Sequence, residues 1–134
     1  VSVVMRRHEE SEHQIALIQW WDHACRRWRA EPRDLYAVPN GGRRGKREAA
    51  IMKGEGVRAG QPDLNLDVAV GSYHGLRIEM KRPDREGRRR AQPSVEQRER
   101  LKLYNERGYA TAVCRGWIEA RDVITAYLDG TESG

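Results

Sequence analysis

The chain has 134 residues, with 25 Lys or Arg against 20 Asp or Glu, so its formal net charge is +5. This length fits one domain with a modest core, and we expect a single domain over residues 1–134 whose core lies within residues 10–128. The mean hydropathy of −0.87 and the lack of a long apolar run exclude a membrane span, while the basic balance favours an anionic partner.

The two cysteines, Cys25 and Cys114, each lie inside an apolar segment. Two buried thiols in a reducing compartment are therefore the expected state. The four histidines are scattered without the spacing of zinc ligands, and no secretory leader is recognisable. Together these features predict a cytoplasmic protein with no membrane partner.

Residues 9–29 are predicted to form the first helix, because they carry an apolar stripe at helical spacing. The stripe consists of Leu17, Ile18, Trp21, Cys25 and Trp28. Glu10 and Gln14 fall within the same stripe, whereas Glu12 lies outside it. An inward carboxylate is costly unless it is paired or binds a metal, although Glu10 would also favour the helix N-terminus through the helix dipole.

A short strand is expected at residues 35–38, followed by a turn at residues 39–42 and a small helix that ends near Met52. Four basic residues crowd the start of that helix: Arg43, Arg44, Lys46 and Arg47. Because cations near a helix N-terminus oppose its dipole, contact with phosphate is one explanation for them. A solvated charged face is the other.

Residues 63–81 read as two antiparallel strands joined by a turn at Gly71 and Ser72. The apolar rows alternate along each strand and comprise Leu64, Leu66, Val68 and Val70, then Leu76, Ile78 and Met80. Asp63, Glu79 and Lys81 fall on the opposite, polar face. Two carboxylates and an ammonium gathered in this way indicate a site for a divalent oxygen-seeking metal.

The most basic run of the chain follows Lys81 directly, in a loop predicted between residues 82 and 93. It contains Arg82, Arg85, Arg88, Arg89 and Arg90. A solvated loop is the simplest interpretation of such a run. Its position beside a predicted metal site favours contact with a phosphate backbone, which would make affinity sensitive to salt without reading sequence.

Ser94 and Gln97 form a capping-box pattern, which predicts a helix from Ser94 to Arg107 that stops at Gly108. Its core stripe is expected to hold Val95, Leu101 and either Leu103 or Tyr104. A core strand at residues 109–114 and a helix at residues 117–128 complete the chain. The last helix is expected to bury Trp117, Ala120, Tyr127 and either Val123 or Ile124.

Several longer segments of the sequence resemble the VRR-NUC nucleases of the PD-(D/E)xK superfamily. These segments are PNGGRR (39–44), EGVRAGQPDL (55–64), YHGLRIEMKRP (73–83) and CRGWIEA (114–120), in addition to the pattern Pro62-Asp63, then Glu79-x-Lys81. The resemblance implies an α/β fold with a restriction-endonuclease-like core, in which helices flank a mixed sheet. It also implies catalytic Asp63, Glu79, Lys81 and Gln97, and metal ligands Glu10, Asp63, Glu79 and the Met80 carbonyl. Glu12 is the fallback for Glu10, and the family also places a Gln nearby, here Gln14.

The function implied by this resemblance is Mg²⁺- or Mn²⁺-dependent hydrolysis of DNA phosphodiesters, with Lys81 orienting or deprotonating the attacking water. Arg43, Arg44, Arg82, Arg88 and Arg89 are the expected DNA contacts. Stand-alone phage and bacterial members of the family act as homodimers on four-way junctions, so a junction-resolving homodimer in a bacterial or phage-infected cell is expected. A flap or nicking nuclease, a sequence-specific restriction enzyme and a non-cleaving basic DNA-binding module are the alternatives.

Overall fold

The computed structural model describes residues 3–39 and 45–130, with side chains from residue 9 onward. Its helices are α1 (Val3–Ala24), α2 (Lys46–Gly54), α3 (Val95–Glu106) and α4 (Trp117–Leu128), and its strands are β1 (Leu35–Ala37), β2 (Leu64–Leu66), β3 (Leu76–Lys81) and β4 (Ala110–Arg115). Two single turns of 3-10 helix, Cys25–Trp28 and Pro32–Asp34, connect α1 to β1. The element order agrees with the sequence, and the predicted helix at residues 117–128 is reproduced at both ends.

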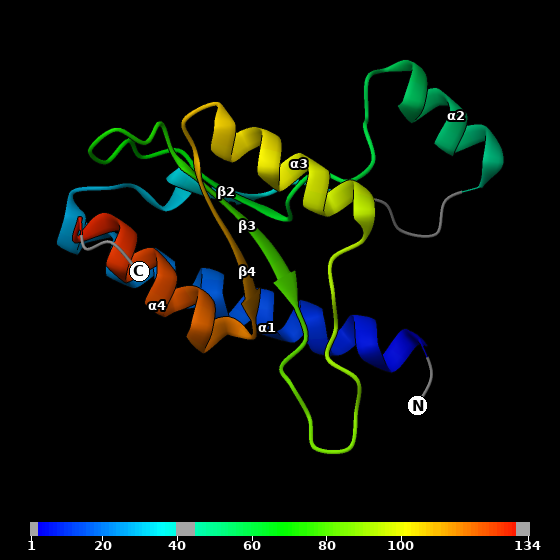
Figure 1. The fold of residues 1–134 in the computed structure, drawn as a ribbon, viewed down its shortest axis with the longest axis horizontal. Coiled ribbons are helices and arrows are strands. Elements are labelled where there is room, and N and C mark those ends of the chain that lie inside the picture. The colour runs from blue at the N-terminus through cyan, green and yellow to red at the C-terminus, as the bar shows by residue number, and fades with distance from the viewer. Residues whose placement is uncertain (1–2, 40–44, 131–134) are drawn as a thin grey trace.

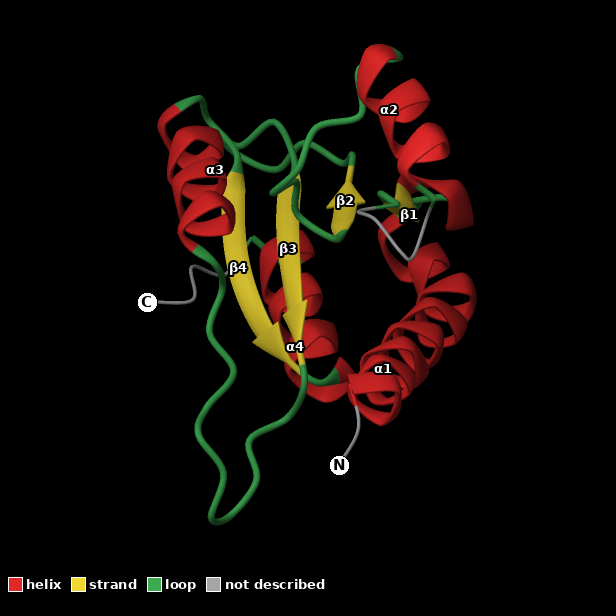
Figure 2. Cartoon of the chain, turned by 90° about the vertical axis from the view of Figure 1, so that its right-hand side faces the viewer, coloured by secondary structure: helices red, strands yellow, loops and turns green. Residues whose placement is uncertain are grey.

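The four strands form one mixed sheet in the order β1-β2-β3-β4. The first three strands pair antiparallel, whereas β4 returns through α3 and pairs parallel to β3. Figure 1 shows α1 and α4 lying together across one face of this sheet, with α3 on the other side. The same arrangement is visible after a quarter turn in Figure 2, where the loop between β3 and α3 projects from one end of the molecule. The predicted α/β class, with helices flanking a mixed sheet, is confirmed.

The hydrophobic core lies between the sheet and the pair α1 and α4. Its buried residues include Leu17 and Trp21 from α1, the alternating apolar residues of β2 and β3, and Ile124 from α4. Cys25 and Cys114 are buried free thiols, as expected. Among the described residues, none of the helices is long and apolar enough to cross a membrane.

Two expectations about local structure are wrong. β2 ends at Leu66, because the Asp67 carboxylate turns to the Arg77 guanidinium at 3.0 Å and the chain then leaves β3. Residues 68 and 70 still pack against the core, and the predicted turn is present as a bridge between Val70 and Tyr73. The second error concerns Val95, which is 59% exposed, since α3 covers a polar sheet face and offers little apolar contact to its first turn.

Polar and aromatic contacts hold α3 on its face of the sheet. The Arg77 guanidinium of β3 lies over the rings of Tyr104 and Tyr109, at 5.2 and 4.4 Å from their centroids. The Gln61 side-chain oxygen accepts hydrogen bonds from Arg100 Nε and the Tyr104 hydroxyl. The polar face predicted from the alternation in β3 is therefore real, but it is buried beneath a helix instead of being open to water.

Candidate active site

Asp63 and Glu79 are brought together by the register of β2 and β3. Leu64 pairs with Ile78 across the antiparallel ladder, so the residues immediately before and after them, Asp63 and Glu79, also lie opposite each other. Asp63 is held there by its Oδ2 atom, which accepts a hydrogen bond of 2.8 Å from the Met80 backbone N–H. The backbone carbonyl of Asp63 accepts a second bond, from the Val38 N–H at 2.9 Å.

Glu79 is an acid in a place that does not suit its charge. The residue is 1% exposed, and its Oε1 atom has no hydrogen-bond partner among the described residues. Burial and the nearby Asp63 carboxyl together raise the pKa of Glu79 to about 8, against a smaller lowering by Lys81. A buried acid beside a second acid is unfavourable in its ionised form, so a positive charge placed next to this pair would stabilise it.

Lys81 lies beside this pair and is positioned by α3. Its Nζ atom is 3.4 Å from Glu79 Oε2 and donates a hydrogen bond of 3.2 Å to Gln97 Oε1. The same Gln97 oxygen accepts the Ser94 backbone N–H at 2.8 Å, while the Gln97 N–H donates to Ser94 Oγ at 3.1 Å. The capping box and the contact with the lysine therefore coexist, and one glutamine connects the start of α3 to the candidate site.

Glu10 approaches the same group from α1. Its side chain is half-buried, and burial raises its pKa; Asp63 adds to the rise, while Lys81 and Arg82 oppose it. These interactions place Glu10 in the electrostatic field of the pair, whereas Glu12 is exposed. Within the part of the chain that the structure describes, no three His, Cys, Asp or Glu side chains are spaced as a ready metal site. Glu10 as a third ligand stays a prediction.

Met80 contributes only its main chain to this region. Its side chain is 3% exposed and belongs to the core, on the face of the sheet opposite Glu79. Its N–H donates to Asp63 Oδ2, and the Met80 carbonyl as a metal ligand stays a prediction. Gln14 is half-buried on α1, one turn beyond Glu10.

Comparison with known proteins identifies a family that shares this fold. No family model matches the chain, and no curated protein matches it in sequence. A solved structure described as a VRR_NUC domain protein superposes with a TM-score of 0.72, at 30% sequence identity, covering 90% of this chain and 88% of that one. The chain belongs to the VRR-NUC family. The family is one of nucleases.

The donor set of this VRR-NUC chain suits the divalent cation that such nucleases use. Hard oxygen ligands are what Mg²⁺ and Mn²⁺ select, and the paired Asp63 and Glu79 carboxyls supply them. A cation there would neutralise the repulsion that raises the pKa of Glu79, and the Oε1 atom, which has no hydrogen-bond partner among the described residues, could coordinate it. The residues present therefore fit the ion.

The arginines predicted to contact DNA lie in different environments in this VRR-NUC chain. Arg43 and Arg44 lie outside the described residues. Arg82 is 9% exposed, and its Nη2 atom donates a 2.6 Å hydrogen bond to the Arg89 carbonyl, so it braces the loop from inside. Arg88 and Arg89 have exposed side chains in the same loop.

Ion pairs at its base hold this loop against the rest of the molecule. Arg85 pairs with Glu9 of α1 at 2.6 Å, and Asp84 pairs with Arg90 at 3.1 Å. Arg115, at the end of β4, lies 3.7 Å from Asp84 and donates a 2.9 Å bond to the Ala91 carbonyl. Three of the loop's arginines therefore have structural partners, and the composition of the run did not reveal which ones.

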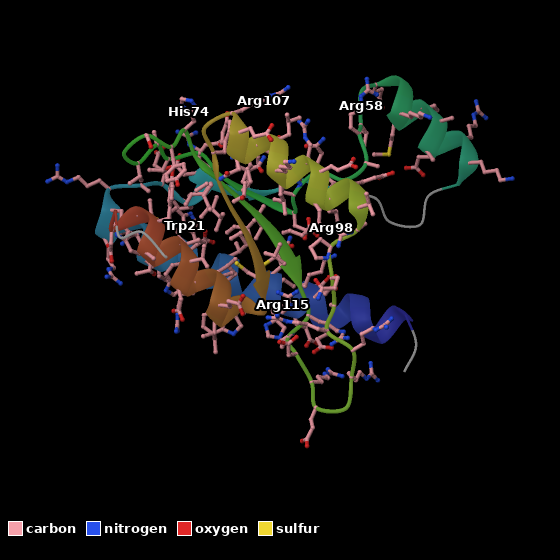
Figure 3. The ribbon with its side chains drawn as sticks, in the orientation of Figure 1. Trp21, Arg58, His74, Arg98, Arg107 and Arg115 are labelled. Carbon is pink, nitrogen blue, oxygen red and sulfur yellow. The ribbon has the colours of Figure 1, made fainter. Side chains whose placement is uncertain are left out.

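Sequence reasoning missed Arg98, which is exposed on α3 immediately after Gln97. Figure 3 shows Arg98 near the start of α3 and Arg115 near the end of β4, toward the carboxyl end of β3 where Lys81 lies. The adjacency of Arg98 to Gln97 was the only sequence signal for it. Arg115 carried a similar signal, since it follows the last predicted strand, but its guanidinium is committed to the loop.

Proposed function

We propose that this VRR-NUC chain is a Mg²⁺- or Mn²⁺-dependent, structure-selective DNA endonuclease that acts as a homodimer on four-way junctions. The observation that supports metal-dependent hydrolysis is the half-buried Asp63 opposite the buried Glu79, with Lys81 Nζ 3.4 Å from Glu79 Oε2. Such a pair is destabilising as a purely structural feature, so a catalytic use accounts for its presence better than packing does.

Each residue of the site has a task in this proposal. Asp63, Glu79, Glu10 and the Met80 carbonyl would hold the cation, which when bound would polarise the scissile phosphate and acidify a water molecule. Lys81 would orient that water or balance charge on the phosphorane-like transition state as an ammonium, or would take the proton of the water as a neutral amine. Gln97 accepts a hydrogen bond from Lys81 and so keeps the ammonium near Glu79, with the capping box fixing the glutamine in turn.

The DNA would enter over the end of the molecule where β3 and β4 finish. Arg88 and Arg89 in the projecting loop and Arg98 on α3 are exposed, and Figure 3 shows Arg98 near the start of α3. Contacts from such exposed arginines position a phosphate backbone without reading bases. That property suits an enzyme that selects a DNA shape, and two copies related by a two-fold axis match the symmetry of a four-way junction.

The test uses purified protein with a labelled four-way junction, a flap and a linear duplex, each with Mg²⁺, Mn²⁺ or EDTA. Paired symmetric cuts in the junction that need the metal are the expected result, together with the mass of a dimer in solution. Cuts confined to the flap, or single nicks, would show that the enzyme is a flap or nicking nuclease instead of a junction resolvase. Binding to all three substrates without any cut, with either metal, would overturn the proposal.

Asp63→Asn is the matched control for that assay. Asparagine keeps the volume of Asp63 and can still accept the Met80 N–H, so the β2–β3 pairing should survive. It removes a charge from the proposed cation site. Cleavage by Asp63→Asn at the wild-type rate would show that the cuts come from a contaminating nuclease or a different site.

A further inference from the structure

The start of α4 receives its hydrogen-bond acceptor from another helix. Helix N-termini leave N–H groups without partners, and a side chain at the N-cap position normally accepts one of them. The N-cap of α4 is Gly116, which has no side chain to offer. His13 of α1 takes this role, because its Nδ1 atom accepts the Trp117 N–H at 3.0 Å. The proton of the neutral ring is therefore on Nε2.

This contact is where three segments of the chain meet. The Gly116 N–H donates a 3.0 Å hydrogen bond to the carbonyl of Lys81, at the end of β3. A Cβ atom at Gly116 would lie 3.0 Å from Pro83 Cγ and 3.4 Å from the His13 ring. The close approach and the φ of 90° both call for glycine. One junction thus connects α1, the start of α4 and the strand that carries Lys81.

His13 also lies where α1 has little other anchorage. Among the side chains of α1 that the structure describes, from residue 9 onward, Leu17 is the first that is fully buried, so residues 9–16 are held by weaker contacts. Glu9 pairs with Arg85, but the Arg85 side chain is 45% exposed, and ion pairs near the surface contribute little. The His13 bond is half-buried and falls between Leu17 and Glu10, one helical turn after Glu10.

We propose that His13 is a positioning residue, which fixes α1 against the end of β3 so that Glu10 faces Asp63 and Lys81. The inference rests on the proposed function, because it gives Glu10 a share in holding the divalent cation. Residues that orient metal ligands without touching the metal commonly change affinity for it by about 10- to 100-fold when they are removed. His13 would act in this way through the backbone of α1.

The experiment measures Mn²⁺ binding to the DNA-free protein by calorimetry, and the Mg²⁺ concentration that half-saturates cleavage. His13→Ala is expected to weaken both by about 10-fold or more. His13→Asn is expected to stay within about threefold of wild type, because asparagine Oδ1 can accept the Trp117 N–H in place of Nδ1. His23→Ala, an exposed histidine of the same helix, is the matched control and should behave as wild type.

A purely structural role is separated by combining variants. If His13 acts through Glu10, His13→Ala should weaken Mn²⁺ binding no further once Glu10 is replaced by Gln. An equal loss in both backgrounds, or wild-type Mn²⁺ affinity in folded His13→Ala, would overturn the inference. His13→Leu, which fills the space without an acceptor, carries the same expectations if the alanine variant does not fold. Wild-type protein that neither binds Mn²⁺ nor cuts DNA would instead refute the proposed function.

Discussion

Replacing Glu79 by Gln should stabilise the metal-free protein at alkaline pH. Glutamine has nearly the shape of glutamate but cannot ionise. Glu79 is 1% exposed and has a pKa of about 8, against 4.5 for an ordinary glutamate, since burial and the neighbouring Asp63 disfavour its charge. The unfolded chain ionises near pH 4.5, whereas the folded chain holds the proton until about pH 8.

The sign follows from proton linkage. Between these two pH values the folded state binds more protons than the unfolded state, so stability falls as pH rises. The stabilising contribution of protonated Glu79 is complete below pH 4.5 and is lost as pH approaches 8. Each pH unit counts about 1.4 kcal/mol, which gives an upper limit of about 5 kcal/mol if Glu79 titrated alone. Sharing of the proton with Asp63 reduces this, and we expect about 2–3 kcal/mol.

The assay is urea denaturation of wild type and Glu79→Gln in EDTA at pH 5 and pH 8.5. The two proteins should have similar free energies of unfolding at pH 5, and the variant should be more stable by the amount above at pH 8.5. Mn²⁺ added at pH 8.5 should stabilise wild type more than the variant, because it binds the ionised pair. Parallel pH profiles for the two proteins in EDTA would refute the electrostatic account of the site.

Three further changes test other parts of the molecule. Lys81→Ala should leave DNA binding nearly intact and lower the cleavage rate by about 10²–10⁴-fold, measured by gel shift and single-turnover cleavage. Replacing both Arg88 and Arg89 by Ala should weaken DNA binding and lower the dependence of log K on log salt by about two, in a salt titration. Gly116→Ala should destabilise the fold by about 2–3 kcal/mol in denaturation, whereas Gly54→Ala should not.

Each of these has an outcome that would count against it. Retained cleavage by Lys81→Ala would remove the lysine from the mechanism. An unchanged salt slope in the double arginine variant would leave the loop without a role in binding. Replacing both Arg26 and Arg29 by Ala, in and at the end of the turn that follows α1, removes the same number of charges and provides the control. Equal stability of Gly116→Ala and wild type would contradict the crowding that Pro83 and His13 impose.

The predictability of this fold depended on how local each signal was. The helix at residues 117–128 and the capping box at Ser94 are specified by nearby residues, so the sequence located them closely. Strand alternation placed Leu64 and Ile78 on the core side without knowledge of the helices. The parallel pairing of β4 with β3 is a long-range property, and it rested on resemblance because periodicity does not specify which strands are neighbours.

The limits at the site have the same origin. Strand alternation placed Asp63, Glu79 and Lys81 on one face. It did not predict that this face is buried, because the cover is α3, which packs there through Arg77 and other polar contacts. Nothing in the local sequence marks His13, whose partner is far away in the chain. In the loop, composition predicted that the guanidinium groups lie in solvent. Arg82 instead turns inward, because a backbone carbonyl there accepts a hydrogen bond from its guanidinium.

The candidate site concentrates unfavourable electrostatics that the surrounding fold has to tolerate. The strand register fixes Asp63 and Glu79 opposite each other, since the same ladder pairs the core residues Leu64 and Ile78. Relaxing the pair would mean slipping the register, which would turn those core side chains toward α3. The apolar pattern of β2 and β3 therefore holds two acids together, and binding of the proposed cation would recover the free energy that this arrangement costs.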